Sequence, residues 1–268
     1  MSDFDKDTRA ALDSIDKVNP FATYLEDSTL SRVGGWIDTG SYVLNAIVSG
    51  SIHGGIPKGR VTMLGGESMT GKTLFVLKIL ANAQKEGLIP VIFDTENAVD
   101  PEGAERIGLD ISKVKYVPCV TIEQTRNALY KFLTSVKEKG LEGKFIVAID
   151  SLGNLQSELE HSRMGKESTS SDMGSKARAM KSLMQTCTNL GATTQTTILC
   201  TNHVYDDPAA MFPSIEKHMP GGKSIVYLPS VTVQLARKPM KSDGGKTMDA
   251  ETAVGQKNYA GVLIRALT

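Results

Sequence analysis

The sequence predicts an α/β fold in which a mostly parallel, twisted sheet is covered by helices on both faces. Short apolar runs alternate along the chain with segments that carry apolar residues at helical spacing. One run leads into a glycine-rich turn that ends in Gly71-Lys72-Thr73, and another, Phe145 to Asp150, is unbroken and ends in a carboxylate. Strands that alternate with helices form parallel sheets, and such strands read as continuous apolar runs because both of their faces are buried.

The first forty residues differ from the rest of the chain. Leu12, Ile15 and Val18 stand at helical spacing, and the Asn19-Pro20 pair ends that pattern. We expect residues 1–40 to form a short amphipathic helix and a connector that folds back or docks on a neighbouring copy. Residues 41–268 are expected to form the core domain.

Within the core the pattern is regular. Short β-branched and apolar runs predict strands, and longer stretches with apolar residues three and four apart predict helices. The predicted elements are, in order, helix 42–48, strand 60–64, helix 74–83, strand 90–94, strand 114–117, helix 122–136, strand 145–150 and strand 197–200. In such a sheet, ligands bind at the carboxyl ends of the strands.

Composition fits one large domain with a substantial core. The 268 residues are 40% hydrophobic and 22% charged, and the formal net charge is zero. These values exclude a disordered or fibrous chain. The balanced charge neither supports nor excludes a nucleic-acid partner, which would require local basic patches. Cys119, Cys187 and Cys200 are far apart in apolar surroundings, so we expect reduced thiols and no metal cluster.

No association with a membrane is expected. No apolar run approaches the length that crosses a bilayer. The N-terminal residues 1–5 are acidic where a secretion signal would be basic. We therefore expect a cytoplasmic location.

One segment has the composition of a loop that binds nucleotide phosphates. Its residues are Gly66, Glu67, Ser68, Met69, Thr70, Gly71, Lys72, Thr73 and Leu74. The glycines permit backbone angles that let peptide N–H groups point at phosphate oxygens. Lys72 is expected to reach the β- and γ-phosphates, and the Thr73 hydroxyl to hold Mg²⁺. The segment thus predicts binding of ATP and Mg²⁺, and the alternative is a chance glycine-rich turn.

Polar residues follow three of the predicted strands. Asp150 is placed as an acid that holds Mg²⁺, although it could instead cap a helix. Glu96 could orient and deprotonate the water that attacks the γ-phosphate, although a carboxylate after a strand is more often on the surface or capping. Asn202 and His203 could sense the γ-phosphate, and the alternative for His203 is a satisfied core histidine.

Two long polar segments, 154–174 and 204–222, follow two of these strand ends. Loops of this length are usually functional or disordered. Basic residues in or near them are Arg163, Lys166, Lys176, Arg178, Lys181, Lys217 and Lys223. They could follow a phosphate backbone while Met and Phe side chains wedge against bases. The alternative is two mobile surface loops of ordinary mixed charge.

Several motifs occur in a recognisable order. They are Ile37-Asp38-Thr39-Gly40-Ser41, Gly54-Gly55-Ile56-Pro57-Lys58-Gly59-Arg60, the phosphate loop, Phe93-Asp94-Thr95-Glu96-Asn97-Ala98-Val99-Asp100 and Asp150-Ser151. In this order they resemble the RecA family of ATP-dependent recombinases. Finer details at 172–173, 180–183, 202–205 and 211–212 are similar to the recombinases of T-even phages.

The resemblance implies a RecA-like core that forms a helical filament on single-stranded DNA and hydrolyses ATP while it exchanges strands with double-stranded DNA. It implies a catalytic role for Glu96 and Lys72, Mg²⁺ sites at Thr73 and Asp150, contact of Asp100 with adenine, and a relay through Asn202 and His203. The implied DNA-binding residues are Arg163, Met173, Lys176, Arg178, Lys181, Met211, Phe212, Gly221, Gly222 and Lys223. Implied partners are a single-strand-binding protein and a loading mediator.

The chain departs from the family pattern in two places. Gly103 stands where the family often has a tyrosine that stacks on adenine. The run 261–268 is strand-like, and basic residues that the family carries beyond it do not follow. We therefore expect a chain truncated at its C-terminal end that binds ATP but turns it over slowly or assembles poorly. The alternatives are a hexameric DNA helicase and a weakly hydrolysing recombinase paralogue or mediator.

Overall fold

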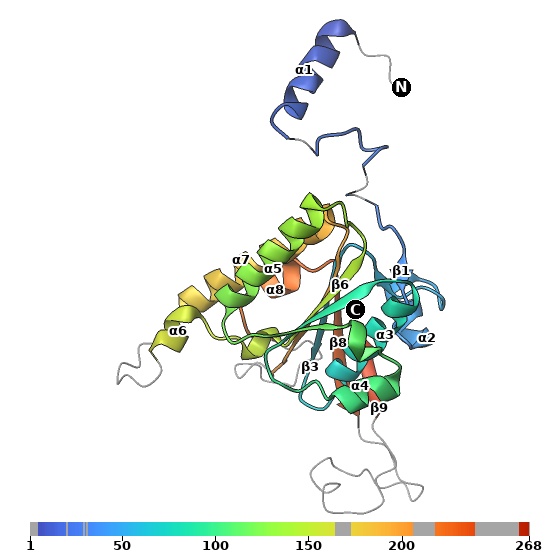
Figure 1. Cartoon of the computed structure of the whole chain (residues 1–268), viewed down its shortest axis with the longest axis vertical. Helices are drawn as coiled ribbons and strands as arrows, with labels where there is room; N and C mark the ends of the chain where they lie inside the picture. Colours follow the sequence, from blue (N-terminus) through green and yellow to red (C-terminus); the bar gives the residue numbers. More distant parts are fainter. Residues whose placement is uncertain are drawn as a thin grey trace, which may run out of the picture.

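The computed structural model describes residues 5–19, 21–28, 30, 32–163, 173–205, 218–238 and 263–267. Helices lie on both sides of one central sheet, and an N-terminal arm extends away from it (Figure 1). The helices are α1 (Lys6–Asp16), α2 (Tyr42–Ser49), α3 (Lys72–Lys85), α4 (Pro101–Ile107), η1 (Ile111–Lys113), α5 (Ile122–Glu138), η2 (Leu152–Asn154), α6 (Glu158–Ser162), α7 (Met173–Thr193) and α8 (Ser224–Tyr227). The strands are β1 (Trp36–Ile37), β2 (Ile56–Pro57), β3 (Val61–Gly66), β4 (Ile89–Asp94), β5 (Lys115–Pro118), β6 (Phe145–Asp150), β7 (Thr197–Asn202), β8 (Val231–Lys238) and β9 (Leu263–Leu267).

The main sheet has the strand order β5-β4-β6-β7-β3-β8-β9. Six of these strands run parallel, and β9 pairs antiparallel with β8 at one edge. The register sets Asp94 opposite Asp150 and Gly65 opposite Asn202. The carboxyl ends of β4, β6, β7 and β3 therefore meet along one edge of the sheet. This arrangement confirms the α/β fold with a mostly parallel sheet.

Two apolar cores hold the helices against the sheet, one on each face. On one face, α3 contributes Val76, Ile79 and Leu80 to a buried cluster with Ile92 of β4. On the other, α5 and α7 pack together and bury side chains such as Leu129 against β6. Figure 1 shows α5, α7 and α8 on one side of the strands and α3 and α4 on the other. Because both faces are covered, the strands between them are almost entirely apolar.

All the predicted core elements are present, with boundaries that differ by a few residues. The strand at 145–150 has the bounds expected from the sequence. The helix expected at 74–83 starts earlier, at Lys72, because the left-handed Gly71 directly precedes its first turn. The strand expected at 197–200 runs on to Asn202, so that the polar residues thought to follow it lie at its end.

The prediction of a long loop at 154–174 is wrong in part. Two short helices, η2 and α6, lie in it, α7 begins at Met173, and residues 164–172 lie outside the described chain. The Ser157 hydroxyl accepts the Glu160 N–H, and the Glu160 carboxylate accepts the Ser157 N–H. This Ser-x-x-Glu capping box is a helix-start signal that the sequence carries.

Helix α7 was missed altogether by the sequence prediction. Its buried residues Met180, Leu183, Met184 and Cys187 stand three and four positions apart, which is the spacing of one helix face. Methionine and cysteine are less obvious core residues than leucine or valine, which hid the pattern. The three free cysteines, Cys187 among them, are all buried.

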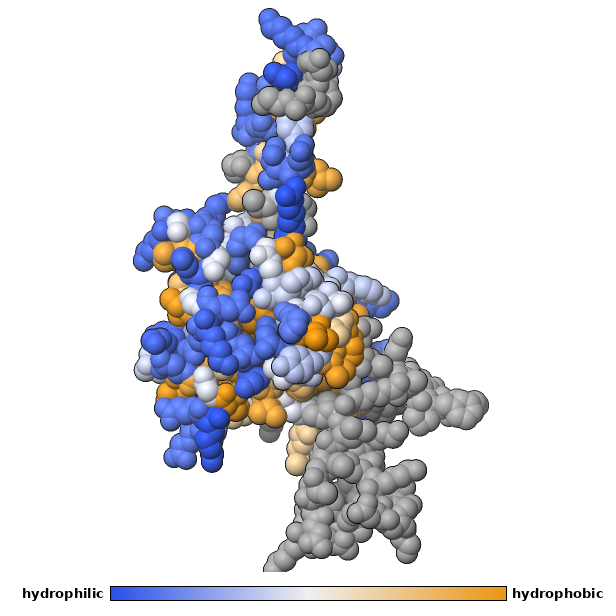
Figure 2. All heavy atoms as spheres, turned by 90° about the vertical axis from the view of Figure 1, so that its right-hand side faces the viewer, coloured by the Kyte–Doolittle hydropathy of each residue, from blue (hydrophilic) through white to orange (hydrophobic). Residues whose placement is uncertain are grey.

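The arm lies largely clear of the core. No residue of α1 is buried, and the helix is capped by Asp5, whose carboxylate accepts the N–H groups of Asp7 and Thr8. Figure 2 shows polar and apolar residues mixed along the protruding arm. The connector makes two contacts with the core. The Phe21 ring lies 3.9 Å from the Lys137 ammonium, measured from the ring centre, and the Leu30 carbonyl accepts a hydrogen bond from Arg60. Among the described helices, none has the length and apolar character needed to span a bilayer.

The core that positions the site can be tested at Leu129, which is fully buried between α5 and the sheet. Leu129→Ala should lower the free energy of unfolding by about 2–5 kcal/mol, because it removes buried apolar surface and leaves a cavity. The matched control is Leu25→Ala in the arm, where the side chain is 79% exposed. Its effect should stay within about 0.5 kcal/mol. Urea denaturation followed by circular dichroism measures both, and equal effects would contradict the assigned core.

Candidate functional site

The phosphate loop lies between β3 and α3, as the sequence predicts. A Cβ on Gly66 would lie 2.5 Å from Thr70 Oγ1 and 3.0 Å from the Leu235 carbonyl oxygen, so only glycine fits there. Gly71 has a φ of +86°, in the left-handed region that glycine adopts freely. The Lys72 ammonium donates to the carbonyl oxygens of Gly66 and Glu67, 2.9 Å from each. The loop thus curls around the lysine side chain at the N-terminus of α3, where helix dipole and peptide N–H groups favour an anion.

The other residues of the predicted loop fall into two groups. Thr70 is buried and donates its hydroxyl to the Glu67 carbonyl, which closes the turn from within. Ser68, Met69 and Leu74 are exposed, and Met69 has a φ of +61°. Thr70 therefore fixes the shape of the loop from inside, while Ser68, Met69 and Leu74 present their side chains on the surface.

Asp150 ends β6 and lies beside the loop. Its carboxylate accepts the Thr73 hydroxyl at 2.7 Å and the Thr201 hydroxyl, and the residue is only 5% exposed. Burial raises the pKa of Asp150, and the hydrogen bonds from Thr201 and Thr73 oppose that rise without cancelling it. The Asp150 oxygens thus accept side-chain hydroxyls from α3 and β7, and the predicted role of Asp150 as an acid beside a metal stays a prediction.

The residues around Asp150 fit a magnesium ion bound through phosphates. A threonine hydroxyl that donates its proton to a carboxylate keeps its oxygen lone pairs for a cation. Within the described ranges, no group of three or more His, Cys, Asp or Glu side chains is placed to hold a metal. An ion at this edge would therefore take the Thr73 oxygen and phosphate oxygens as ligands, with Asp150 behind the threonine, which is how Mg²⁺ is usually held beside nucleotides.

Glu96 follows β4 and meets groups from two neighbouring strands. Its carboxylate accepts the Ser151 hydroxyl and lies 3.0 Å from His203 Nε2. Burial raises the pKa of Glu96, but the hydrogen bonds from Ser151 and His203 and the charges of His203 and Lys72 outweigh burial, so the pKa lies below its ordinary value. The two carboxylates of the site are thus shifted in opposite directions, Asp150 upward and Glu96 downward.

The Lys72 ammonium lies in the field of both carboxylates. Burial lowers its pKa, and the negative charges of Asp150 and Glu96 oppose that effect. The net direction is downward. A lysine cation near two acids and held by the carbonyls of a glycine-rich loop is suited to a strongly anionic ligand.

Asn202 and His203 join this acid edge to the segment after β7. Asn202 is fully buried; its amide donates to the Pro220 carbonyl at 3.0 Å, and its side-chain oxygen accepts the His203 N–H at 2.9 Å. His203 is no core histidine, because 41% of its side chain is exposed and it pairs with Glu96. A chain of contacts therefore runs from Glu96 through His203 and Asn202 to Pro220.

Asp100 is the N-cap of α4. Its carboxylate accepts the N–H groups of Glu102 and Gly103, and Arg106 lies 3.6 Å from it. The adjoining Pro101 stands at the first helical position, where it is preferred. Asp100 thus has a structural role, and its predicted contact with a nucleotide base stays a prediction.

Several of the predicted DNA-binding residues meet in one groove. It has a volume of about 470 Å³ and is lined by Ala177, Arg178, Lys181, Gly222, Lys223, Ser224, Tyr227 and Leu228. Gly221 and Gly222 both have positive φ, +109° and +86°, which lets the chain turn from the Pro220 segment into α8. The basic residues come from α7 and from the start of α8, elements far apart in the sequence.

The remaining predicted DNA-binding residues lie elsewhere. Lys176 is 3.9 Å from the Glu160 carboxylate, and Arg163 follows α6 half-buried. Met173 is the first residue of α7. Met211 and Phe212 lie outside the described residues, as do Lys166 and Lys217.

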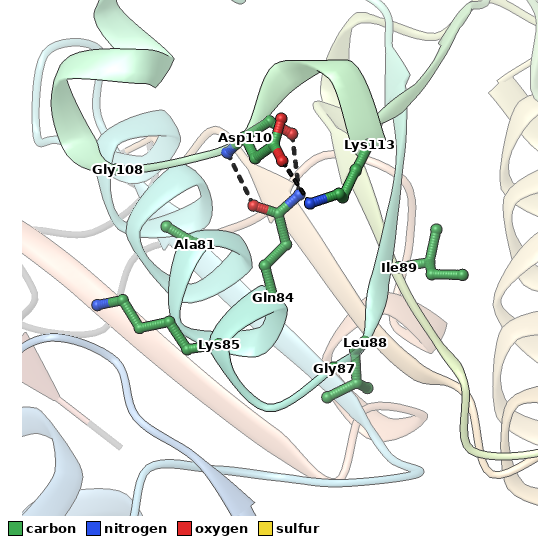
Figure 3. A pocket seen from close by; sticks show the side chains of 9 residues that line it. All are labelled: Ala81, Gln84, Lys85, Gly87, Leu88, Ile89, Gly108, Asp110 and Lys113. Atoms are coloured by element: carbon green, nitrogen blue, oxygen red, sulfur yellow. Dashed lines mark hydrogen bonds and ion pairs between the residues drawn. The ribbon is translucent and has the colours of Figure 1, made fainter.

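A second hollow of about 420 Å³ lies near the amino end of β4, away from the acid edge (Figure 3). The Gln84 side-chain amide donates to the Asp110 carbonyl at 3.0 Å, and its oxygen accepts the Asp110 N–H at 2.9 Å. Lys113 pairs with the Asp110 carboxylate at 2.8 Å. The polar groups drawn in Figure 3 thus largely satisfy one another, and the strand-end site is the stronger candidate.

Sequence reasoning missed three residues that hold the acids in place. Thr201 donates to Asp150, and the Ser151 hydroxyl donates to Glu96. Thr95 exchanges hydrogen bonds with the Ser151 backbone, its hydroxyl donating to the carbonyl and accepting the N–H. All three stand at or next to predicted strand ends, and that position was the available signal.

A parallel sheet with a Gly-Lys-Thr loop after β3 and acids at neighbouring strand ends defines a P-loop nucleotide-binding protein. The family model described as the RecA N-terminal domain matches residues 7–261. The chain is 33% identical over 220 residues to Protein RecA of Chlorobium chlorochromatii, a match that covers 81% of this chain and 58% of that protein. It is 32% identical over 231 residues to Protein RecA of Chlorobaculum parvum, covering 85% and 62%.

The chain therefore belongs to the RecA family. Its matches span about three fifths of the length of these curated relatives.

The low pKa of Glu96 makes a testable contribution to stability. Because its folded-state pKa lies below the ordinary 4.5, ionised Glu96 stabilises the fold above pH 4.5, and this stabilisation is lost as the pH falls through the folded-state pKa. The difference in free energy of unfolding between the wild type and Glu96→Gln should therefore hold between about pH 5 and pH 6 and shrink below about pH 4.5. Urea titrations across this range measure it.

The control is Glu138→Gln at the end of α5, which reports the effect of removing a carboxylate remote from the site. A wild-type minus Glu96→Gln difference that stays constant down to about pH 3 would contradict a lowered pKa.

Proposed function

We propose that this chain is the ATP-hydrolysing core of a DNA recombinase that assembles on single-stranded DNA and pairs it with homologous double-stranded DNA. The observation that carries the proposal is the cluster of Lys72, Thr73, Asp150 and Glu96 at one sheet edge, with Glu96 joined through His203 to the Pro220 segment. Family membership supports it further, because the matched relatives bear the name Protein RecA.

In this proposal the chain's own residues divide the work of hydrolysis. The peptide N–H groups of the loop and the Lys72 ammonium bind and neutralise the β- and γ-phosphates. Thr73, backed by Asp150, would hold a Mg²⁺ ion, and that ion would neutralise charge that develops on the phosphates. Glu96, kept ionised by its lowered pKa, orients the attacking water and accepts its proton.

The link from Glu96 to the groove offers a route from nucleotide to DNA. His203 contacts the catalytic carboxylate, and Asn202 beside it binds the Pro220 carbonyl, two residues from the groove-lining Gly222. A change in what Glu96 contacts would shift His203 and, through Asn202, the segment that carries Gly221 and Gly222. We propose that ATP favours a DNA-gripping arrangement of this segment and that hydrolysis releases it.

The proposal extends to assembly and partners. The arm, with no buried residue in α1, is suited to docking on a neighbouring copy, and a head-to-tail contact that does not close generates a helical filament. We further propose that the protein works in the cytoplasm with a single-strand-binding protein and a loading mediator. His203, Tyr205 and the 180–183 motif favour a recombinase like the phage protein UvsX.

Steady-state ATP hydrolysis with and without single-stranded DNA tests the proposed enzyme. The wild type should turn over ATP faster with DNA, and Lys72→Ala should abolish turnover because phosphate binding loses its cation. Glu96→Gln should keep ATP affinity and lower kcat at least about 100-fold, since it removes the general base. Lys72→Ala also controls for contaminating ATPases.

A wild type that binds ATP tightly without turnover, with or without DNA, would contradict the proposed hydrolysis. That result would favour the mediator-like binding module instead.

The groove makes a separate prediction about DNA affinity. Lys181→Ala and Lys223→Ala should each weaken binding of single-stranded DNA and reduce the dependence of log affinity on log salt by about 0.7 for each phosphate that the variant no longer neutralises. Fluorescence anisotropy with a labelled oligonucleotide, at several salt concentrations and saturating ATP, measures both quantities. The control is Lys113→Ala, which changes a lysine of the second hollow. Equal salt slopes for all three variants and the wild type would exclude the groove as a phosphate-binding surface.

A further inference from the structure

The turn that carries Glu96 is fastened from inside by a buried carboxylate, that of Asp94. Asp94 ends β4 and is only 1% exposed. One carboxylate oxygen accepts the Glu96 N–H at 3.0 Å, and the other accepts the Val99 N–H at 3.3 Å and the Tyr116 hydroxyl at 3.1 Å. Both ends of the turn 96–99 are therefore attached to one side chain.

Tyr116 approaches this carboxylate from the neighbouring strand β5. In addition to its bond to Asp94, its hydroxyl lies 3.5 Å from Asn97 Oδ1, inside the turn. Burial raises the pKa of Tyr116, and the charge of Asp94 and the hydrogen bond to it add to this. The donors to the Asp94 carboxylate are two peptide N–H groups and a phenol, and all three are uncharged. Each of these hydrogen bonds therefore contributes to offsetting the free-energy cost of burying the carboxylate.

The turn also has little freedom on its other side. Thr95 is held by the Ser151 backbone, and its own carbonyl accepts the Asn154 amide. Asn97 has a φ of +53°, a left-handed conformation that Asn tolerates better than most residues but that still has to be maintained by its surroundings. The orientation of Glu96 thus depends on contacts made by its neighbours as well as on its own contacts with Ser151 and His203.

We propose that Asp94 and Tyr116 are positioning residues for Glu96: the phenol holds the buried carboxylate, and the carboxylate fixes the turn that aims Glu96 at its water. The inference rests on the proposed hydrolysis of ATP and adds two residues to it. Neither residue contacts the nucleotide or the reacting atoms in the proposed hydrolysis. Displacement of a catalytic group by as little as about 1 Å can lower a rate by about 100-fold, so a fixed turn has a measurable consequence.

Tyr116→Phe is the sharpest test, because it removes one hydroxyl from a side chain that is 45% exposed and leaves the ring in place. We expect kcat for ATP to fall by about 3- to 30-fold while the Kd for ATP stays unchanged, since the phosphate loop is not altered. Hydrogen exchange of the peptide amides over 95–99 should become faster. Tyr42→Phe makes the same chemical change at a side chain on α2 that is 71% exposed. It should alter neither kcat, nor the Kd for ATP, nor the exchange of the amides over 95–99.

A second variant, Asp94→Asn, keeps the size of the side chain but only one acceptor oxygen, so it cannot accept from both the Glu96 N–H and the Val99 and Tyr116 donors. Its kcat should fall further than that of Tyr116→Phe, and Tyr116→Phe should cause little additional loss in the Asp94→Asn background, because the two act through the same contact. Independent, multiplying losses would overturn the proposal that Tyr116 acts through Asp94.

The outcomes separate the possible roles. Faster exchange with an unchanged kcat would mean that Tyr116 only stabilises the turn, and unchanged exchange would mean that it does not hold the turn; either result overturns the inference. A wild type that shows no turnover would refute the proposed hydrolysis. The exchange comparison between Tyr116→Phe and Tyr42→Phe would then still decide whether the phenol and Asp94 fasten the turn.

Discussion

The parallel alignment of the central strands is the constraint on which the rest of this structure depends. Because β3, β4, β6 and β7 point the same way, their carboxyl ends meet at one edge. The chain leaves the sheet at each of these ends, where backbone groups are free to turn and polar side chains can stand without disturbing the apolar interior. The phosphate loop, the two acids and His203 lie together at this edge, although they are spread over more than a hundred residues of sequence.

The two carboxylates of the site are held by hydroxyl groups and by one histidine. Asp150 is held by two threonines, one from the phosphate loop and one from β7. Glu96 is held by a serine and a histidine. Asp150 is only 5% exposed, so burial raises its pKa more than the two threonine hydrogen bonds lower it. The Glu96 side chain is 33% exposed, and its partners outweigh the weaker effect of burial, so its pKa falls. Environment thus differentiates two carboxylates that are chemically alike.

The same edge connects the site to the groove beyond it. Asn202 is fully buried and bridges the end of β7 to Pro220, while His203 beside it reaches the carboxylate of Glu96. Because a fully buried amide without its partners would be costly, this connection is expected to move as a unit rather than to break. A continuous chain of hydrogen bonds therefore runs from Glu96 to the Pro220 segment beside the groove, even though these residues belong to different segments.

The sequence by itself determined the strands β3 to β7, the phosphate loop and the acids, because apolar runs and a Gly-Lys-Thr turn are local patterns that depend on neighbouring residues alone. It also predicted the family through motifs at 93–100 and 150–151. It could not show that His203 pairs with Glu96, that Thr201 supports Asp150, or that Tyr116 reaches Asp94. Those contacts join residues on different strands, and only the strand order and register of the folded sheet bring them within hydrogen-bonding distance.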